Sequence, residues 1–134
     1  MLECLILGDS IAVGTKMFAP TECVAYAKGG WNSWQWNKDY LHHRLDADTV
    51  VISLGSNDHQ GVKTYQELKK LRTKVNAKKV FWILPAIKPH IQDIVRRIAR
   101  ENGDVIVKIP ALQPDGIHPS WRGYKGIVKE TLQR

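Results

Sequence analysis

The sequence contains no hydrophobic run close to the roughly 20 residues that a helix needs to cross a bilayer. Its N-terminus lacks the basic region and the small-residue cleavage site of a signal peptide. We therefore expect a cytoplasmic protein that does not act in a membrane. Release by cell lysis, as for a phage-encoded protein, would leave the same two absences.

Cysteine is scarce, because the 134 residues include only Cys4 and Cys23. Two cysteines are too few for a disulfide framework, and a structural zinc site usually takes four ligands. Both lie in apolar surroundings, so we favour the interpretation that they are small buried hydrophobic residues. They could also meet across neighbouring strands, and the sequence leaves that pairing open.

Acidic residues are few relative to basic ones, at 13 against 20, which gives a formal net charge of +7 and a pI near 9.5. This balance raises a polyanion as a partner. The sequence has no Walker loop, no Gly-x-Gly-x-x-Gly fingerprint and no histidines at metal-ligand spacing. We therefore expect no cofactor and no metal, and we do not favour nucleic acid as the partner.

Short apolar runs alternate with helical patterns along the whole chain, which predicts an α/β protein with one domain over residues 1–134. The expected strands are 2–7, 23–27, 48–54, 79–84 and 105–109. The expected helices are 33–45, 65–75, 91–98 and 121–132. Strands that are apolar on both faces and separated by helices pair in parallel, so we predict a three-layer α/β/α sandwich.

Small and polar residues follow several of the expected strands. In an open parallel sheet the ligand site forms beyond the carboxyl ends of the strands, so these residues are predicted to converge. The four segments are Gly8-Asp9-Ser10-Ile11, Gly30-Trp31-Asn32-Ser33, Gly55-Ser56-Asn57-Asp58 and Asp115-Gly116-Ile117-His118.

In their order and placement these four segments resemble the sequence blocks of the SGNH hydrolases, the GDSL esterase and lipase superfamily, over nearly the whole chain. The resemblance implies a flavodoxin-like five-stranded parallel sheet. It also implies Ser10 as the nucleophile, with Asp115 and His118 completing a catalytic triad. Gly30 corresponds to the glycine of the oxyanion hole, with Gly29 as the alternative, and Asn57 to its asparagine.

The chemistry of these residues agrees with those roles. A serine hydroxyl needs a positioned base, and the imidazole of His118 can take up and return its proton near neutral pH. The carboxylate of Asp115 would orient the imidazole. The backbone N–H groups of Ser10 and Gly30 and the amide of Asn57 would form the oxyanion hole.

The residues around these blocks have more open roles. We expect Asp9 and Asp58 to support the loops structurally. Among the tryptophans at positions 31–36, Trp31 is the favoured substrate contact, and Trp34 is expected to pack its helix against the sheet. His59 is a candidate for the substrate pocket, and a solvated loop histidine is an equally good interpretation.

The segments between the blocks are short, with 20 residues from Ser10 to Gly30 and 27 from Gly30 to Asn57. They leave little material for a lid or a deep acyl tunnel, so we expect an open site for small acyl groups. The resulting hypothesis is a serine esterase that removes short acyl groups, acetyl above all, from a carbohydrate. The alternatives are a non-catalytic module that binds a glycan or polyanion, and a thioesterase or lysophospholipase. The sequence makes no prediction of the oligomeric state.

Overall fold

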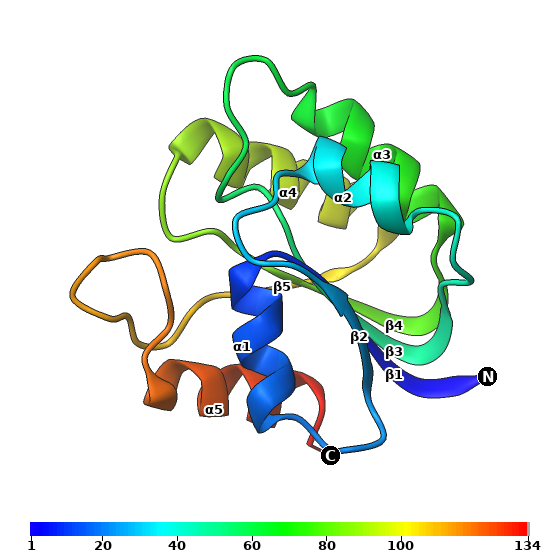
Figure 1. Ribbon diagram of the computed structural model, residues 1–134, viewed down its shortest axis with the longest axis vertical. Helices are drawn as coiled ribbons and strands as arrows, with labels where there is room; N and C mark the ends of the chain where they lie inside the picture. The colour runs from blue at the N-terminus through cyan, green and yellow to red at the C-terminus, as the bar shows by residue number, and fades with distance from the viewer. Residues whose placement is uncertain (134) are drawn as a thin grey trace.

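A computed structural model describes residues 1–133, which form a five-stranded sheet with helices on both faces (Figure 1). All neighbouring strands pair in parallel, in the order β2-β1-β3-β4-β5. The strands are β1 (Leu2–Gly8), β2 (Val24–Ala27), β3 (Asp46–Ser53), β4 (Asn76–Ile83) and β5 (Val105–Val107). The predicted three-layer α/β/α sandwich with a five-stranded parallel sheet is confirmed.

The helices form the two outer layers. In Figure 1, α1 and α5 lie against one face of the sheet, and α2, α3 and α4 lie against the other. Their bounds are α1 (Ser10–Phe18), α2 (Ser33–Tyr40), α3 (Thr64–Lys74), α4 (Pro89–Asn102) and α5 (Trp121–Thr131). Within residues 1–133, no helix combines the length and the hydrophobicity that crossing a membrane requires.

Strand β1 shows why both faces are covered. Its side chains alternate, with Leu5 and Leu7 in the core beneath α2, α3 and α4, and Ile6 in the core of the opposite face. All three are fully buried. Burial on both faces explains the continuous apolar runs, because each face needs its own layer of helices to exclude water.

The order of the strands places a switch point between β1 and β3. The chain leaves β1 toward β2 on one side and later continues through β3 and β4 on the other. At such a point the loops after the two strands diverge to opposite faces of the sheet and leave a crevice between them. Ser10 follows β1 and Asn57 follows β3, so the crevice lies between two of the predicted site residues.

Some element bounds differ from the expectations. Helix α1 was not predicted, because it has only nine residues and a short apolar face, although Asp9 before it is a good N-cap residue. The helix expected over 33–45 ends at Tyr40, and β3 begins at Asp46 instead of position 48. Strand β5 stops at Val107, two residues before the expected end. These errors reflect the weakness of local signals at element ends.

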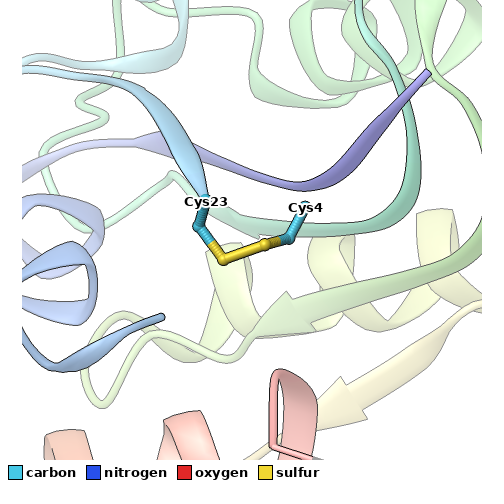
Figure 2. Close-up of a disulfide and its surroundings, with 2 residues drawn as sticks. All are labelled: Cys4 and Cys23. Carbon is cyan, nitrogen blue, oxygen red and sulfur yellow. A yellow bond between two sulfur atoms is a disulfide. The ribbon is translucent and has the colours of Figure 1, made fainter. Parts of the chain in front are cut away.

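The two cysteines form a disulfide between β1 and the start of β2 (Figure 2). The Cα atoms of Cys4 and Cys23 lie 4.7 Å apart, and both residues are buried. The predicted burial of both residues is confirmed, and the pairing that the sequence left open is present. The sheet order makes β1 and β2 direct neighbours, and this adjacency brings together two residues 19 positions apart.

Candidate active site

The crevice begins where β1 and β3 end side by side. Gly8 lies so close to the backbone of Ser53 that a Cβ atom on Gly8 would collide with the Ser53 carbonyl. Its φ of 143° is also one that residues with side chains rarely adopt. This close approach lets the N–H of Asp9 donate to the Ser53 carbonyl oxygen at 3.0 Å. The glycine thus fixes the first residue of the loop that carries Ser10.

Asp9 starts helix α1 and thereby orients Ser10. Its Oδ1 accepts hydrogen bonds from the N–H of Ile11 at 3.0 Å and from the hydroxyl of Ser53 at 3.2 Å. Its Oδ2 is buried and has no hydrogen-bond partner among residues 1–133. Burial raises the pKa of Asp9 to about 6, against the effect of these hydrogen bonds. The structure thus places Asp9 in the supporting position expected of it.

Three of the predicted residues form a connected chain. The Oγ atom of Ser10 lies 2.9 Å from Nε2 of His118, and Nδ1 of His118 lies 2.7 Å from Oδ2 of Asp115. Ser10 is the first residue of α1, whereas Asp115 and His118 belong to the long loop between β5 and α5. The side chains of His118 and Asp115 are 36% and 41% exposed, so this chain of groups lies open to solvent.

The state of Asp115 determines which nitrogen of the His118 imidazole carries the proton. Hydrogen bonds from the N–H of Ile117 and from the side chain and N–H of His118 lower the pKa of Asp115 to about 2. An ionised carboxylate only accepts, so Nδ1 of a neutral His118 carries the proton and donates it to Asp115. Nε2 is then the acceptor for the hydroxyl of Ser10. This is the tautomer in which the imidazole can act as a base toward Ser10.

The predicted oxyanion donors lie at the start of α1 and in the loops that follow β2 and β3. Gly30 has a φ of 81°, and a Cβ atom on it would point into open space. The neighbouring Gly29 packs against Ser10, because its added Cβ would lie 3.7 Å from the Cβ of Ser10. Nδ2 of Asn57 donates one hydrogen bond to the carbonyl of Trp31 at 3.0 Å, which leaves its second N–H available. The two loops are thus tied together directly beside Ser10.

The carboxylate of Asp58 connects the loop that carries Asn57 to two helices. It is buried, and its carboxylate accepts from the N–H of Ser33 at 2.9 Å, the hydroxyl of Ser33 at 2.6 Å and the hydroxyl of Thr64 at 2.8 Å. Ser33 begins α2 and Thr64 begins α3, so one side chain joins the Asn57 loop to the starts of two helices. The sequence predicted support from Asp58. The side-chain partners were missed, although a serine and a threonine at helix starts are a recognisable signal.

The tryptophans differ from the expectation. Trp36 is fully buried and donates from Nε1 to the carbonyl of Tyr26 at 2.8 Å, so it is the residue that packs α2 against the sheet. Trp34, expected to pack, is instead 51% exposed. Trp31 is half-buried, with its ring 5.8 Å from that of Tyr40. The 3.6-residue period of α2 explains the correction, because positions 34 and 36 face about 200° apart.

His59 is exposed at the edge of the site. Its Nδ1 accepts from the N–H of Gly61 at 3.0 Å, and the residue borders a hollow of about 320 Å³ together with Trp34. Within residues 1–133, no three or more His, Cys, Asp or Glu side chains form a group that could hold a metal ion.

Solved structures share this architecture. The chain superimposes with a TM-score of 0.67 on a protein named "putative acylhydrolase" from Bacteroides fragilis, at 20% identity, covering 96% of this chain and 83% of the other. The chain shares the fold of this protein. A "putative GDSL-like lipase" from Parabacteroides merdae has the same fold, with a TM-score of 0.59, 16% identity and coverage of 95% and 93%.

In sequence, the chain matches no protein-family model and no curated protein. The similarity to the two solved structures therefore establishes the fold, and the activity has to be argued from this chain's own residues.

Proposed function

We propose that the protein is a serine esterase that hydrolyses short-chain acyl esters, acetyl esters above all, on a carbohydrate. The observation that carries the proposal is the continuous contact from Ser10 through His118 to Asp115, with distances of 2.9 and 2.7 Å. Base-assisted attack requires a hydroxyl that donates to the imidazole and a carboxylate that accepts from it, and Ser10 and Asp115 occupy these two positions around His118.

In the acylation step, Oγ of Ser10 attacks the carbonyl carbon of the ester and its proton passes to Nε2 of His118. The imidazolium is stabilised by the carboxylate of Asp115. As the bond between the acyl carbon and the alcohol oxygen breaks, His118 returns the proton to that oxygen. The products are the free alcohol and an acyl group on Ser10.

In the deacylation step, a water molecule adds to the acyl carbon and gives its proton to His118. The bond to Ser10 then breaks, the proton returns to Oγ, and the carboxylic acid leaves. The exposure of His118 favours this step, because water reaches the base without a lid having to open. An open site also favours small acyl groups, since it offers a long chain little apolar surface.

The negative charge that forms on the carbonyl oxygen needs donors already in place. We assign this role to the N–H groups of Ser10 and Gly30 and to Nδ2 of Asn57. The N–H of Ser10 is the first of helix α1 and has no partner within the helix, and the helix dipole adds positive potential at this end. The carbonyl of Trp31 holds the amide of Asn57 at one N–H and leaves the other free.

The carbohydrate part of the proposal rests on Trp34. Its exposed ring borders two hollows of about 180 and 320 Å³, and Gln35 lines both of them. Nζ of Lys38 lies 5.3 Å from the centre of the ring. A flat aromatic face beside amide, ammonium and carboxylate groups suits a sugar, which is apolar on its faces and polar at its hydroxyls. The net charge of +7 favours an acidic glycan.

The activity is tested with p-nitrophenyl esters of two, four and eight carbons, with Ser10→Ala as the control. We expect the acetyl ester to be hydrolysed fastest, no turnover by Ser10→Ala, and labelling of Ser10 by a fluorophosphonate. Absence of both turnover and labelling in the wild-type protein would contradict the proposal. A preference for the eight-carbon ester would instead favour the lysophospholipase alternative.

The substrate class is tested by acetate release from acetylated xylan, which is neutral, and acetylated pectin, which is acidic. Trp34→Ala is expected to raise KM for both polysaccharides and to leave hydrolysis of p-nitrophenyl acetate unchanged, whereas Trp34→Phe keeps a stacking face and preserves most of the binding. Equal KM values in all three proteins would contradict a role for Trp34 in glycan binding.

A further inference from the structure

Lys88, in the loop between β4 and α4, adopts an unusual backbone conformation. Its φ of 63° and ψ of 79° make it the only residue other than glycine with a positive φ among residues 1–133. Glycine and asparagine adopt such angles at the least cost, and a lysine is strained there. Strain of this kind persists where the surrounding structure holds it, and it gathers at functional sites.

The side chain of Lys88 reaches across to the loop that follows β3. Its Nζ donates to the carbonyl oxygens of Ser56 and Asp58, each at 2.8 Å. These two carbonyls flank Asn57 in the sequence, so one ammonium group holds the backbone on both sides of that residue. The hydrogen bonds join a charged donor to neutral acceptors, which makes them stronger than ordinary backbone contacts.

The loop is also held by its own turn, in which the N–H of Asp58 donates to the carbonyl of Gly55 at 3.0 Å, and Lys88 adds contacts at two further carbonyls. Asp58 ties its own side chain to Ser33 and Thr64, and the amide of Asn57 is held by the carbonyl of Trp31. Lys88 holds the carbonyl oxygens of Ser56 and Asp58, the residues before and after Asn57. Donors in an oxyanion hole are effective only when their orientation is fixed before the charge forms.

We propose that Lys88 is a positioning residue that fixes the backbone of Asn57 so that its amide meets the oxyanion. This inference rests on the proposed esterase function. It also explains why a strained lysine stands where glycine would be free of strain, because glycine has no ammonium group to hold the two carbonyls. Because the oxyanion forms only in the transition state, the loss of Lys88 lowers kcat and leaves KM nearly unchanged.

The test compares Lys88→Met and Lys88→Gly with the wild type in the hydrolysis of p-nitrophenyl acetate. We expect both variants to lower kcat by about 10- to 100-fold, less than the complete loss of an oxyanion donor. Lys63→Met is the matched control, because Lys63 is an exposed lysine nearby whose side chain makes no hydrogen bond or ion pair among residues 1–133. Its kcat is expected to equal that of the wild type.

Two further measurements separate positioning from general support of the fold. Lys88 borders a hollow of about 370 Å³, so added methylammonium should reach the vacated position and restore part of the kcat of Lys88→Gly. In a double-mutant cycle, Lys88→Met should cause no further loss in an Asn57→Ala background, because its effect passes through Asn57. Thermal unfolding of each variant checks that the fold is intact.

The outcomes distinguish this inference from the function it rests on. A wild-type protein without turnover would contradict the proposed function itself. An active wild-type protein whose Lys88→Met and Lys88→Gly variants keep full kcat would overturn only the role of Lys88. Independent, multiplying losses in the double-mutant cycle would overturn it as well, because Lys88 would then act by a route other than Asn57.

Discussion

The hydroxyl of Ser10, at the start of α1, lies 2.9 Å from Nε2 of His118 in the loop before α5. This distance is short enough for the imidazole to accept the proton of the hydroxyl. Asp115, on the far side of the imidazole, fixes its tautomer. The predictions below test this site and the structure that holds it.

Asp115→Asn is expected to lower kcat by up to about 10⁴-fold, because an amide favours the wrong imidazole tautomer. Some activity should remain, since Asp115 is 41% exposed and water can replace part of its hydrogen bonding. Measurement of kcat and KM for p-nitrophenyl acetate, with Ser10→Ala as the inactive reference, checks this. Full activity in Asp115→Asn would show that the carboxylate does not orient the base.

The pH dependence of activity should not reflect the titration of Asp115. Its hydrogen bonds hold its pKa at about 2, below the ordinary 3.8, so the carboxylate stays ionised throughout the range from pH 4 to 8. A rate profile measured over that range in wild type and in Asp115→Glu checks the point. A step in kcat near pH 4 that is present in wild type and shifted in the variant would contradict it.

Asp9 is expected to make the protein less stable as the pH rises from 4 to 6. Burial raises its pKa from 3.8 to about 6, so in that window the folded protein binds more protons than the unfolded chain. The free energy of unfolding therefore falls as the pH rises, by at most about 3 kcal/mol. Urea unfolding at pH 4, 5, 6 and 7 measures the slope.

Asp9→Asn should flatten this slope and raise the free energy of unfolding at pH 7, because an amide carries no buried charge. Its Oδ1 can still accept from Ile11 and Ser53. Asp39→Asn, which removes an exposed carboxylate from α2, is the control and should keep the wild-type slope. An unchanged slope in Asp9→Asn would assign the pH dependence to other groups.

Gly29 and Gly30, in the loop between β2 and α2, are expected to differ in their tolerance of a side chain. Gly30→Ala should lower kcat, because alanine at a φ of 81° costs about 1–2 kcal/mol and turns the N–H away from the oxyanion. Gly29→Ala should stay active, since the new Cβ would make an ordinary contact with Ser10 at 3.7 Å. The reverse ranking of the two kcat values would identify Gly29 as the donor.

The disulfide is expected to stabilise the fold by about 3 kcal/mol, on the chain-entropy estimate for a loop of this length. Urea unfolding with and without a reducing agent measures the difference, and the variant with both Cys4→Ala and Cys23→Ala should not respond to the reductant. Two free thiols in the denatured, unreduced protein would contradict the pairing.

A cytoplasmic location stays a prediction, and disulfides are uncommon in that compartment.

The positions of the site residues could be predicted from the sequence because they follow local patterns. Apolar β-branched runs such as 48–54 mark strands, and a small or polar residue after a strand marks its carboxyl end. Parallel pairing then requires that these ends share one edge. The layers and the parallel sheet could be predicted on that basis, and the resemblance of the four segments to the SGNH blocks predicted the pairing of Ser10 with His118.

Other features could not be predicted, because they depend on which elements become neighbours. Cys4 and Cys23 pair because β2 lies directly beside β1. Trp34 is exposed and Trp36 buried because the face of α2 that carries Trp36, and not the opposite face, packs in the core with the sheet. Lys88 reaches the carbonyls around Asn57 only because the β4–α4 loop passes beside the loop after β3.

The sequence by itself therefore predicted the fold class, since backbone preference and hydrophobic period are properties of short segments. The candidate site residues were predicted from the resemblance of four segments to the SGNH blocks. The tertiary structure alone decided the disulfide, the exposed tryptophan and the lysine that holds the Asn57 loop. The disulfide and the hydrogen bonds of Lys88 join residues that are 19 to 32 positions apart in the sequence. Such residues come into contact only when the order of the strands and the packing of the helices are set.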